Sequence, residues 1–387
     1  MLKKSIKINI YLIFFSILLS LYILEAGLTL FDNYQNKQEI KKKIELYKKE
    51  TGKDYDLRKK IEVYHELKKK IKRVGVSFGH RKYFKKNNEI LPLSGLSKAK
   101  TVNCNESGFF SMYESDRYGF NNPDKEWDKK NIDYLLVGDS YGHGACVNDF
   151  DTIAGNVRKL NQNKVDVINL SYDGNGPLTE YASLKEYMPE FKVKKVIWLY
   201  FHNDLLNVSH EINNPILKLY LHDNNFNQNL KNKQKIIDKL VLKQIDQEDG
   251  YVQDLRFNAI DKKINLFPFL KLNLLRFHLI PKKKNDEKKF TQFKKVMIEA
   301  KKYINSQGAD LYFVYLPSFY EINAQHGFKG NRKKIINIIN NLNINSIDMF
   351  PIINQIENPL TIFPFKSNNH YNGIGYKLIA NEIIKLK

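Results

Sequence analysis

The sequence is poor in the residues that define several common classes of protein. With only 2 cysteines in 387 residues, the chain cannot be a small scaffold held together by disulfides. Histidine and cysteine do not cluster at metal-ligand spacing, so we predict no metal ion and no other cofactor. Arginine is scarce too, since lysine supplies most of the 63 basic residues and is spread over the whole chain. Because surfaces that read bases favour arginine, we predict no nucleic-acid partner despite the net charge of +21.

What the chain does contain is typical of a folded protein. Hydrophobic residues make up 42% of the sequence, and 24 Phe with 23 Tyr provide ample apolar area for a core. This composition excludes a disordered chain. The length allows one large domain or two of ordinary size.

The longest run without a charge lies near the N-terminus, over residues 8–24, and its apolar character resumes after Glu25. This length reaches the lower limit for a membrane-spanning helix. Lysines precede the run, and the positive-inside bias keeps such an N-terminus in the cytoplasm. We therefore predict that residues 1–32 are a cytoplasmic tail and a single-pass signal anchor in the cytoplasmic membrane. The C-terminal domain would then be extracytoplasmic, in the periplasm.

Two other interpretations of this segment stay open. The first is a cleaved signal peptide, although no cleavage site with small residues follows the run and the apolar stretch is longer than a usual signal core. The second is the inverted topology, because lysines at positions 37 and 41–43 on the far side weaken the charge asymmetry.

The rest of the chain changes character twice. Residues 33–90 begin with a Lys- and Glu-rich stretch with apolar residues at helical spacing, which predicts a helical juxtamembrane stalk. Residues 91–387 then form the predicted catalytic domain, which starts with turns and short strands. A Lys-rich, mostly helical insertion interrupts this domain at about 205–289. It either caps the active-site crevice or serves as solvated padding or a partner surface.

Within this domain, apolar strands alternate with amphipathic helices, a pattern that predicts a parallel sheet covered on both faces. The predicted strands are residues 134–137, 165–170, 195–201, 309–316 and 346–349. The predicted helices are residues 153–160, 177–187, 290–306, 331–342 and 373–385.

Polar residues follow several of these strands in a consistent order. Gly138-Asp139-Ser140 comes directly after the first strand, Gly174 lies just beyond the second, and Asn203 follows the third. His370 immediately precedes the last helix. Since the carboxyl ends of parallel strands meet at one edge of the sheet, a serine there faces the ligand crevice. Gly-Asp-Ser by itself is weak support, because ordinary turns select the same residues.

This ordered set, within residues 130–205 and 290–387, resembles the SGNH (GDSL-like) hydrolase family. The resemblance implies an α/β fold, a flavodoxin-like three-layer sandwich around a central parallel sheet. It makes Ser140 the nucleophile and His370 the general base. The Ser140 amide, the Gly174 amide and the Asn203 side chain would form the oxyanion hole. The chemistry agrees, because a serine hydroxyl needs an imidazole to take its proton and the tetrahedral oxyanion needs preorganised donors.

The sequence departs from the family pattern at one position. The family usually carries Asp three residues before the histidine, and this chain has Ser367 there. The group that orients His370 is therefore open: the Ser367 hydroxyl, a carboxylate from elsewhere in the chain such as Asp348, a backbone carbonyl, or none in a Ser–His dyad. Loss of the acid in a triad costs about ten-thousandfold in rate, so the departure bears on activity.

The two cysteines bear on the compartment. Cys104 lies in Asn103-Cys104-Asn105-Glu106, and Cys146 lies six residues after Ser140. If the domain is extracytoplasmic, we expect a disulfide that ties the segment before the core to the nucleophile helix. The alternative is two buried free thiols.

Together these features predict a membrane-anchored serine esterase or O-acyltransferase that works through an acyl-serine intermediate. The expected substrate is an acylated glycan or lipid of the cell envelope or the extracellular space, with acetyl as the acyl group and polysaccharide-assembly proteins as partners. One alternative is a catalytically weak or inactive protein of this fold with a glycan-binding or assembly role. Another is a lipase or thioesterase that faces the cytoplasm.

Overall fold

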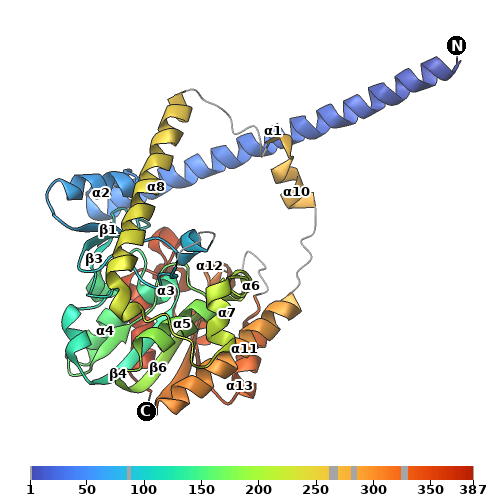
Figure 1. Ribbon diagram of the computed structural model, residues 1–387. Coiled ribbons are helices and arrows are strands. Elements are labelled where there is room, and N and C mark those ends of the chain that lie inside the picture. The colour runs from blue at the N-terminus through green and yellow to red at the C-terminus, as the bar shows by residue number, and fades with distance from the viewer. Residues whose placement is uncertain (1, 85–88, 261–268, 280–285, 324–329, 387) are drawn as a thin grey trace. The chain divides into compact units, whose positions relative to one another are not determined.

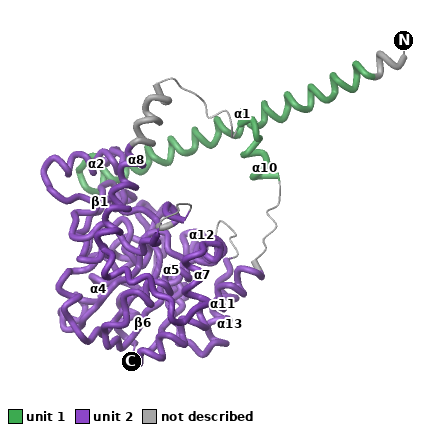
Figure 2. Tube along the Cα trace, viewed as in Figure 1, with its two compact units in different colours: residues 1–54, 250–285 green, residues 55–249, 286–387 purple. Residues whose placement is uncertain are grey.

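The computed structural model describes residues 2–84, 89–260, 269–279, 286–323 and 330–386 (Figure 1). The chain divides into two compact units, which Figure 2 shows in different colours. The first contains residues 1–54 and 250–285, and the second contains residues 55–249 and 286–387. Residues 55–90, which the sequence assigned to a stalk, thus belong to the second unit.

The first unit is dominated by one long helix, α1 (Leu2–Thr51). Part of this helix is long and apolar enough to cross a membrane, with a mean hydropathy of 2.0 over an 18-residue stretch that is almost entirely exposed. Such a helix is compatible with a single-pass anchor or with a signal sequence. The short helix α10 (Asn273–Leu279) packs against α1 within the same unit.

The second unit is built around a parallel sheet of five strands in the order β5-β4-β6-β7-β8. The strands are β4 (Asn131–Gly138), β5 (Val167–Asn169), β6 (Lys192–Phe201), β7 (Asp310–Leu316) and β8 (Asn345–Asp348). Their positions confirm the strands predicted from the sequence. In the register of the sheet, Gly138 pairs with Leu199, so the strands that precede Ser140 and Asn203 end side by side.

Helices cover both faces of this sheet, and the predicted three-layer α/β fold is confirmed. Alternate strand residues such as Leu136, Leu199 and Val314 join a buried cluster with α4, α14 and α15. The intervening residues face the other side, where α5, α11 and α13 contact the strands. The bounds are α4 (Ile153–Leu160), α5 (Pro177–Tyr187), α11 (Asp286–Ser306), α13 (Arg332–Asn341), α14 (Met349–Asn354) and α15 (Gly373–Ile383).

Capping residues explain where the helices nearest the site begin. The Thr152 hydroxyl accepts a hydrogen bond from the Gly155 amide at 3.0 Å and starts α4. Asn372 caps α15 by accepting from the Ile374 amide at 3.0 Å. Short polar side chains satisfy the free amides of a first helical turn, which fixes these boundaries locally.

The helical insertion covers helix α5, all of whose residues are buried. Helices α6 (Asp204–Glu211) and α7 (Pro215–His222) both pack against α5. The Glu211 carboxylate accepts hydrogen bonds from the Gly176 and Leu178 amides, at 2.7 and 2.9 Å, and so caps α5. The described residues also form the helices α2 (Lys60–Lys68), α8 (Gln234–Ile260) and α12 (Phe319–Ile322). Short 3-10 turns among them are η1 (His80–Tyr83), η2 (Asp124–Asp128), η3 (Asp149–Asp151), η4 (Leu230–Lys233), η6 (Pro359–Ile362) and η7 (Pro364–Lys366).

A small second sheet precedes the large one in the chain. Its strands are β1 (Val74–Val76), β2 (Lys100–Val102) and β3 (Met112–Glu114), with β1 parallel and β3 antiparallel to β2. The loop between β2 and β3, residues 103–111, is closed by backbone hydrogen bonds of 2.9 Å that join Ser111 to Asn103 and to Cys104. This loop carries a residue of the candidate site.

Candidate active site

The turn from β4 into the short helix α3 (Ser140–His143) presents Ser140. Asp139 caps this helix, because its carboxylate accepts a hydrogen bond from the Tyr141 amide at 2.9 Å. Gly142 allows α3 to lie against the end of β5, since a Cβ there would come within 2.4 Å of the Ser171 hydroxyl. The small residues after β4 therefore serve a close approach that brings Ser140 to the edge of the sheet.

His370 lies directly beside this serine. The distance between the Ser140 Oγ and the His370 Nε2 is 2.8 Å, and both residues are half-buried, so solvent and substrate can reach them. Tyr141 helps to hold the histidine, because its ring centroid lies 4.7 Å from that of His370 and its hydroxyl donates to the Asn369 carbonyl at 3.3 Å. The structure thus brings together two of the residues named from the sequence.

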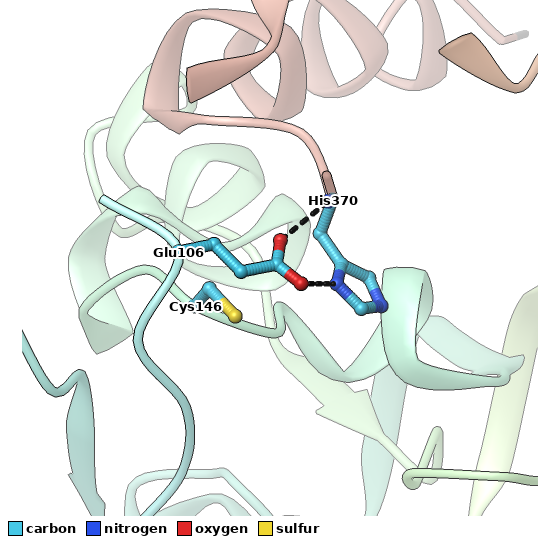
Figure 3. Close-up of side chains that lie close together, drawn as sticks. All are labelled: Glu106, Cys146 and His370. Atoms are coloured by element: carbon cyan, nitrogen blue, oxygen red, sulfur yellow. Dashed lines mark hydrogen bonds and ion pairs between the residues drawn. The ribbon is translucent and has the colours of Figure 1, made fainter. Parts of the chain in front are cut away.

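The third group at this site is Glu106, from the loop between β2 and β3 (Figure 3). Its Oε1 lies 3.0 Å from the His370 Nδ1, and its Oε2 accepts a hydrogen bond of 2.6 Å from the His370 backbone amide. With Nδ1 donating to a carboxylate, Nε2 becomes the ring atom that can accept the Ser140 proton. The arrangement has the order of a Ser–His–Glu triad.

A carboxylate from elsewhere in the chain thus contacts His370, but it belongs to Glu106 and not to Asp348. The Ser367 hydroxyl donates instead to the Phe365 carbonyl at 3.2 Å. The Asp348 carboxylate pairs with Arg332 and accepts from the Phe350 amide, where it caps α14. Among the described residues, Glu106 is the one whose carboxylate bonds to the ring of His370. Neither a backbone carbonyl nor a bare Ser–His dyad is what the structure contains.

The surroundings of His370 shift its pKa in opposite directions. Burial by itself would lower the pKa of His370, but the hydrogen bond and the negative charge of Glu106 outweigh it, so the net shift is upward from 6.5. Asp139 behaves differently, because burial raises its pKa to about 6 despite the Tyr141 amide and the nearby His370. The carboxyl group next to Ser140 is therefore a helix cap that ionises less readily than an ordinary aspartate.

A disulfide fastens the Glu106 loop to the nucleophile segment. Cys104 and Cys146 are bonded, with their Cα atoms 4.9 Å apart. The Cys146 sulfur lies in a group with the Glu106 carboxylate and the His370 ring, within 4.8 Å of one another (Figure 3). This group has the composition of a metal site, but a sulfur in a disulfide has no thiolate to offer as a ligand. The disulfide instead holds the Glu106 loop close to His370.

The two further residues named for the oxyanion hole follow β5 and β6, the strands on either side of β4. Gly174 has a φ of +73° in a loop that is tied to the end of β4, where the Tyr172 amide and the Asn175 side chain both donate to the Gly138 carbonyl, at 3.2 and 3.1 Å. Asn203 lies at the start of α6, directly after β6, which pairs with β4. Both residues are half-buried, like Ser140.

Side-chain contacts next to Gly174 hold its loop in place, and they involve residues that the sequence analysis did not single out. The Asp173 carboxylate lies 2.9 Å from the His143 Nδ1 and also accepts a hydrogen bond from Ser77. Burial by itself would raise the pKa of Asp173, but its interactions with His143, Lys60 and Ser77 outweigh burial and hold that pKa well below its usual range. Segment 60–79 thereby contributes to the position of the loop that carries Gly174.

Comparisons with other proteins give likenesses to solved structures but no match to a family or a curated protein. One solved structure with a similar fold is a protein assigned to the lipolytic G-D-S-L family from Desulfitobacterium hafniense, with 12% sequence identity and a TM-score of 0.37. The match covers 66% of this chain and 99% of that protein. At this TM-score the likeness is too loose to assign a function to this chain.

The chemistry that the site permits follows from its own atoms. A serine hydroxyl within hydrogen-bond distance of an imidazole, whose other nitrogen is held by a carboxylate, is the arrangement that activates serine for attack on an acyl carbon. Sequence reasoning named the serine and the histidine but missed Glu106. A signal was present, because Cys104 lies two positions before Glu106 and a bond to Cys146 carries that segment to the nucleophile.

Proposed function

We propose that this protein is a membrane-anchored serine esterase or O-acyltransferase that works through an acyl intermediate on Ser140. The observation that carries the proposal is the chain of contacts from the Ser140 Oγ through both nitrogens of His370 to the Glu106 carboxylate. His370 takes the serine proton as Ser140 attacks the acyl carbon, and then returns it to the leaving oxygen. Glu106 stabilises the imidazolium that forms between these steps.

The amides of Ser140 and Gly174 and the side chain of Asn203 are the donors that we assign to the oxyanion. Support comes from their places at neighbouring strand ends and from the hydrogen bonds that tie the Gly174 loop to β4. In this assignment the donors stabilise the negative charge of the tetrahedral intermediate.

The proposed location is outside the cytoplasmic membrane, with α1 as the anchor. The exposed apolar surface of α1 supports an anchor, and Lys3, Lys4 and Lys7 favour an N-terminus that stays in the cytoplasm. A disulfide between Cys104 and Cys146 agrees with this side of the membrane, since disulfides persist in oxidising compartments.

The substrate that we propose is an acetylated glycan or lipid of the cell envelope. An enzyme anchored on the outer side of the membrane meets these ester-bearing polymers and lipids at its own surface. Hydrolysis and transfer share the acyl-serine step and differ in whether water or a hydroxyl group of an acceptor completes the reaction.

The test uses the full-length protein in detergent micelles with p-nitrophenyl acetate as a small ester. We expect hydrolysis above the buffer rate, and we expect Ser140→Ala and His370→Ala to reduce it to background. Each variant is first shown to be folded by its thermal melting curve. Wild-type activity no higher than that of folded Ser140→Ala would contradict the proposal and favour a glycan-binding or assembly role for the same fold.

A further inference from the structure

The first unit contains a buried carboxylate in an unusual place. Glu25 lies within the apolar part of α1, yet its side chain is only 1% exposed. Its two oxygens accept hydrogen bonds from the Leu274 and Leu275 amides, at 2.9 and 2.8 Å. These amides belong to the first turn of α10 and have no partner inside the helix. The Glu25 carboxylate of α1 and the free amides in the first turn of α10 therefore satisfy each other's hydrogen-bonding groups.

A neighbouring residue of α1 makes a second set of contacts with the same segment. The Tyr22 hydroxyl donates to the Leu270 carbonyl at 3.1 Å, and the Tyr22 ring centroid lies 5.6 Å from that of Phe269. Leu275 completes the packing and is only 8% exposed. Residues 269–279 are thus fixed against α1 at the level of Tyr22 and Glu25.

The remaining surface of this segment is apolar and exposed. Leu270, Phe277 and Leu279 are 53%, 60% and 68% exposed. On α1, the apolar side chains around Glu25 are equally open, with Leu24 at 56% and Leu30 at 71%. The two surfaces belong to one unit and meet at the Glu25 contact. An apolar patch of this kind marks a membrane or protein contact rather than a face in water.

The position along α1 favours lipid as the occupant. At about 1.5 Å per residue, Glu25 lies about 27 Å from Lys7 along the axis, close to the ~30 Å thickness of the hydrocarbon core. This level is where a tyrosine such as Tyr22 and helices that lie in the membrane plane are found. Arg276 on the segment is exposed and supplies a cation that can extend to lipid phosphates.

We propose that residues 269–279 form a second membrane contact, lying in the headgroup region of the leaflet that α1 leaves near Glu25. This inference rests on the membrane anchor of the proposed function and extends it. The segment belongs to an insertion in the α/β fold, so the catalytic unit is joined to the membrane-bound unit at three chain connections, after residues 54, 249 and 285. The insertion thereby returns to the bilayer instead of ending in solvent.

The test places the full-length chain in vesicles of phosphatidylcholine and phosphatidylglycerol that contain spin-labelled lipids. Single cysteines replace Phe277, Leu19 or Leu219 and carry a bimane fluorophore. The native cysteines do not compete, because Cys104 and Cys146 are bonded to each other. Leu19 reports the span of α1, and Leu219, which is 43% exposed on α7, is the matched apolar position of the second unit.

We expect the probe at position 277 to be quenched by a label near the headgroups, the probe at 19 by a label deep in the acyl chains, and the probe at 219 by neither. Glu25→Ala should weaken quenching at 277 but leave 19 unchanged, whereas Glu39→Ala should change neither. Quenching at 19 with none at 277 would overturn the second contact while the anchor stands, and would assign this face to water or to a partner protein. Absence of quenching at 19 would overturn the anchor and this inference together.

Discussion

The groups of the candidate active site reach it from two kinds of region. Ser140, Gly174 and Asn203 follow neighbouring strands of the large sheet, and His370 precedes its last helix. Glu106 comes from a loop of the small sheet and is fastened there by a disulfide. The first group is positioned by the topology of the α/β fold, whereas the second depends on a loop that packs onto this fold from outside.

This difference separates the part of the site that the fold itself fixes from the part that depends on the position of one loop. The edge of a parallel sheet holds its groups through the register of buried strands. The Glu106 loop is held by its own backbone hydrogen bonds, by hydrogen bonds that join Asn105 and Gly108 to Asp56, and by the bond between Cys104 and Cys146. Changes in the loop should therefore affect catalysis with less effect on the fold than changes at the strand ends.

Among the variants that distinguish the loop from the sheet, we expect Glu106→Gln to have the largest effect on kcat. The amide keeps the shape of the side chain but removes the charge that stabilises the imidazolium, so kcat should fall about 10²- to 10⁴-fold. Steady-state hydrolysis of p-nitrophenyl acetate measures this. The matched control is Glu114→Gln in β3, an exposed acid of the same small sheet, which should leave kcat unchanged. Equal activity of both variants would remove Glu106 from the mechanism.

On the sheet side, Asn203→Ala should lower kcat about 10²- to 10³-fold, because one donor to the oxyanion is lost. The loss should appear in kcat more than in KM, since the donor acts on charge that develops in the transition state. Asn213→Ala, at an exposed position of the same insertion, serves as the control. A loss in KM alone would assign Asn203 to substrate binding.

Replacement of both cysteines, Cys104→Ser with Cys146→Ser, tests the fastening of the loop. We expect the free energy of unfolding to fall by about 2–4 kcal/mol. Because Glu106 would lose its fixed position, kcat should also fall about tenfold to 100-fold at a temperature where the variant is still folded. Denaturant unfolding and ester hydrolysis measure the two effects. Full activity in a destabilised variant would show that the loop holds its position without the bond.

The dependence of activity on pH should show the coupling between Glu106 and His370. His370 must be neutral to act as a base, and Glu106 raises its pKa above 6.5. The rate should therefore fall as pH decreases through a pKa above that value. In Glu106→Gln the charge is gone, so the acid limb of kcat/KM should move to lower pH. An unchanged limb would mean that another group controls this ionisation.

The smallest effects are expected for the residues near His370 that the sequence analysis named as its orienting groups. Ser367→Ala and Asp348→Asn should each change kcat by less than about twofold, because neither side chain bonds to the histidine. The same ester assay measures them. A large loss of kcat in Ser367→Ala would instead assign the role of orienting His370 to Ser367.

Particular residues show how far sequence reasoning reaches. The buried strands of the sheet appear as apolar runs, and α4 begins where Thr152 provides a cap, so these elements could be placed from local signals. Ser140 and His370 could be named as candidates because each adjoins an element boundary and both belong to the ordered set that carries the family resemblance. Glu106 lies 264 residues before His370, and its contact arises from the packing of a loop that no local pattern describes.

The boundary of the first unit was harder to predict for a similar reason. Helical spacing in residues 33–90 predicted a stalk, but residues from 55 onward pack with the α/β fold. Helical spacing shows that a segment has an apolar face, and it does not show what that face covers. The contacts of residues 269–279 with α1 were hidden in the same way.

The central claim is that Ser140 is activated by His370 and Glu106, and covalent labelling tests it most directly. Full-length protein is treated with a fluorophosphonate, and the adduct is followed by intact mass over time. We expect one adduct on the wild type and none on Ser140→Ala. Labelling of Glu106→Gln should be slower by about 100-fold or more, whereas Glu114→Gln should be labelled at the wild-type rate. Labelling of Glu106→Gln at the wild-type rate, or no adduct on the folded wild type, would contradict the claim.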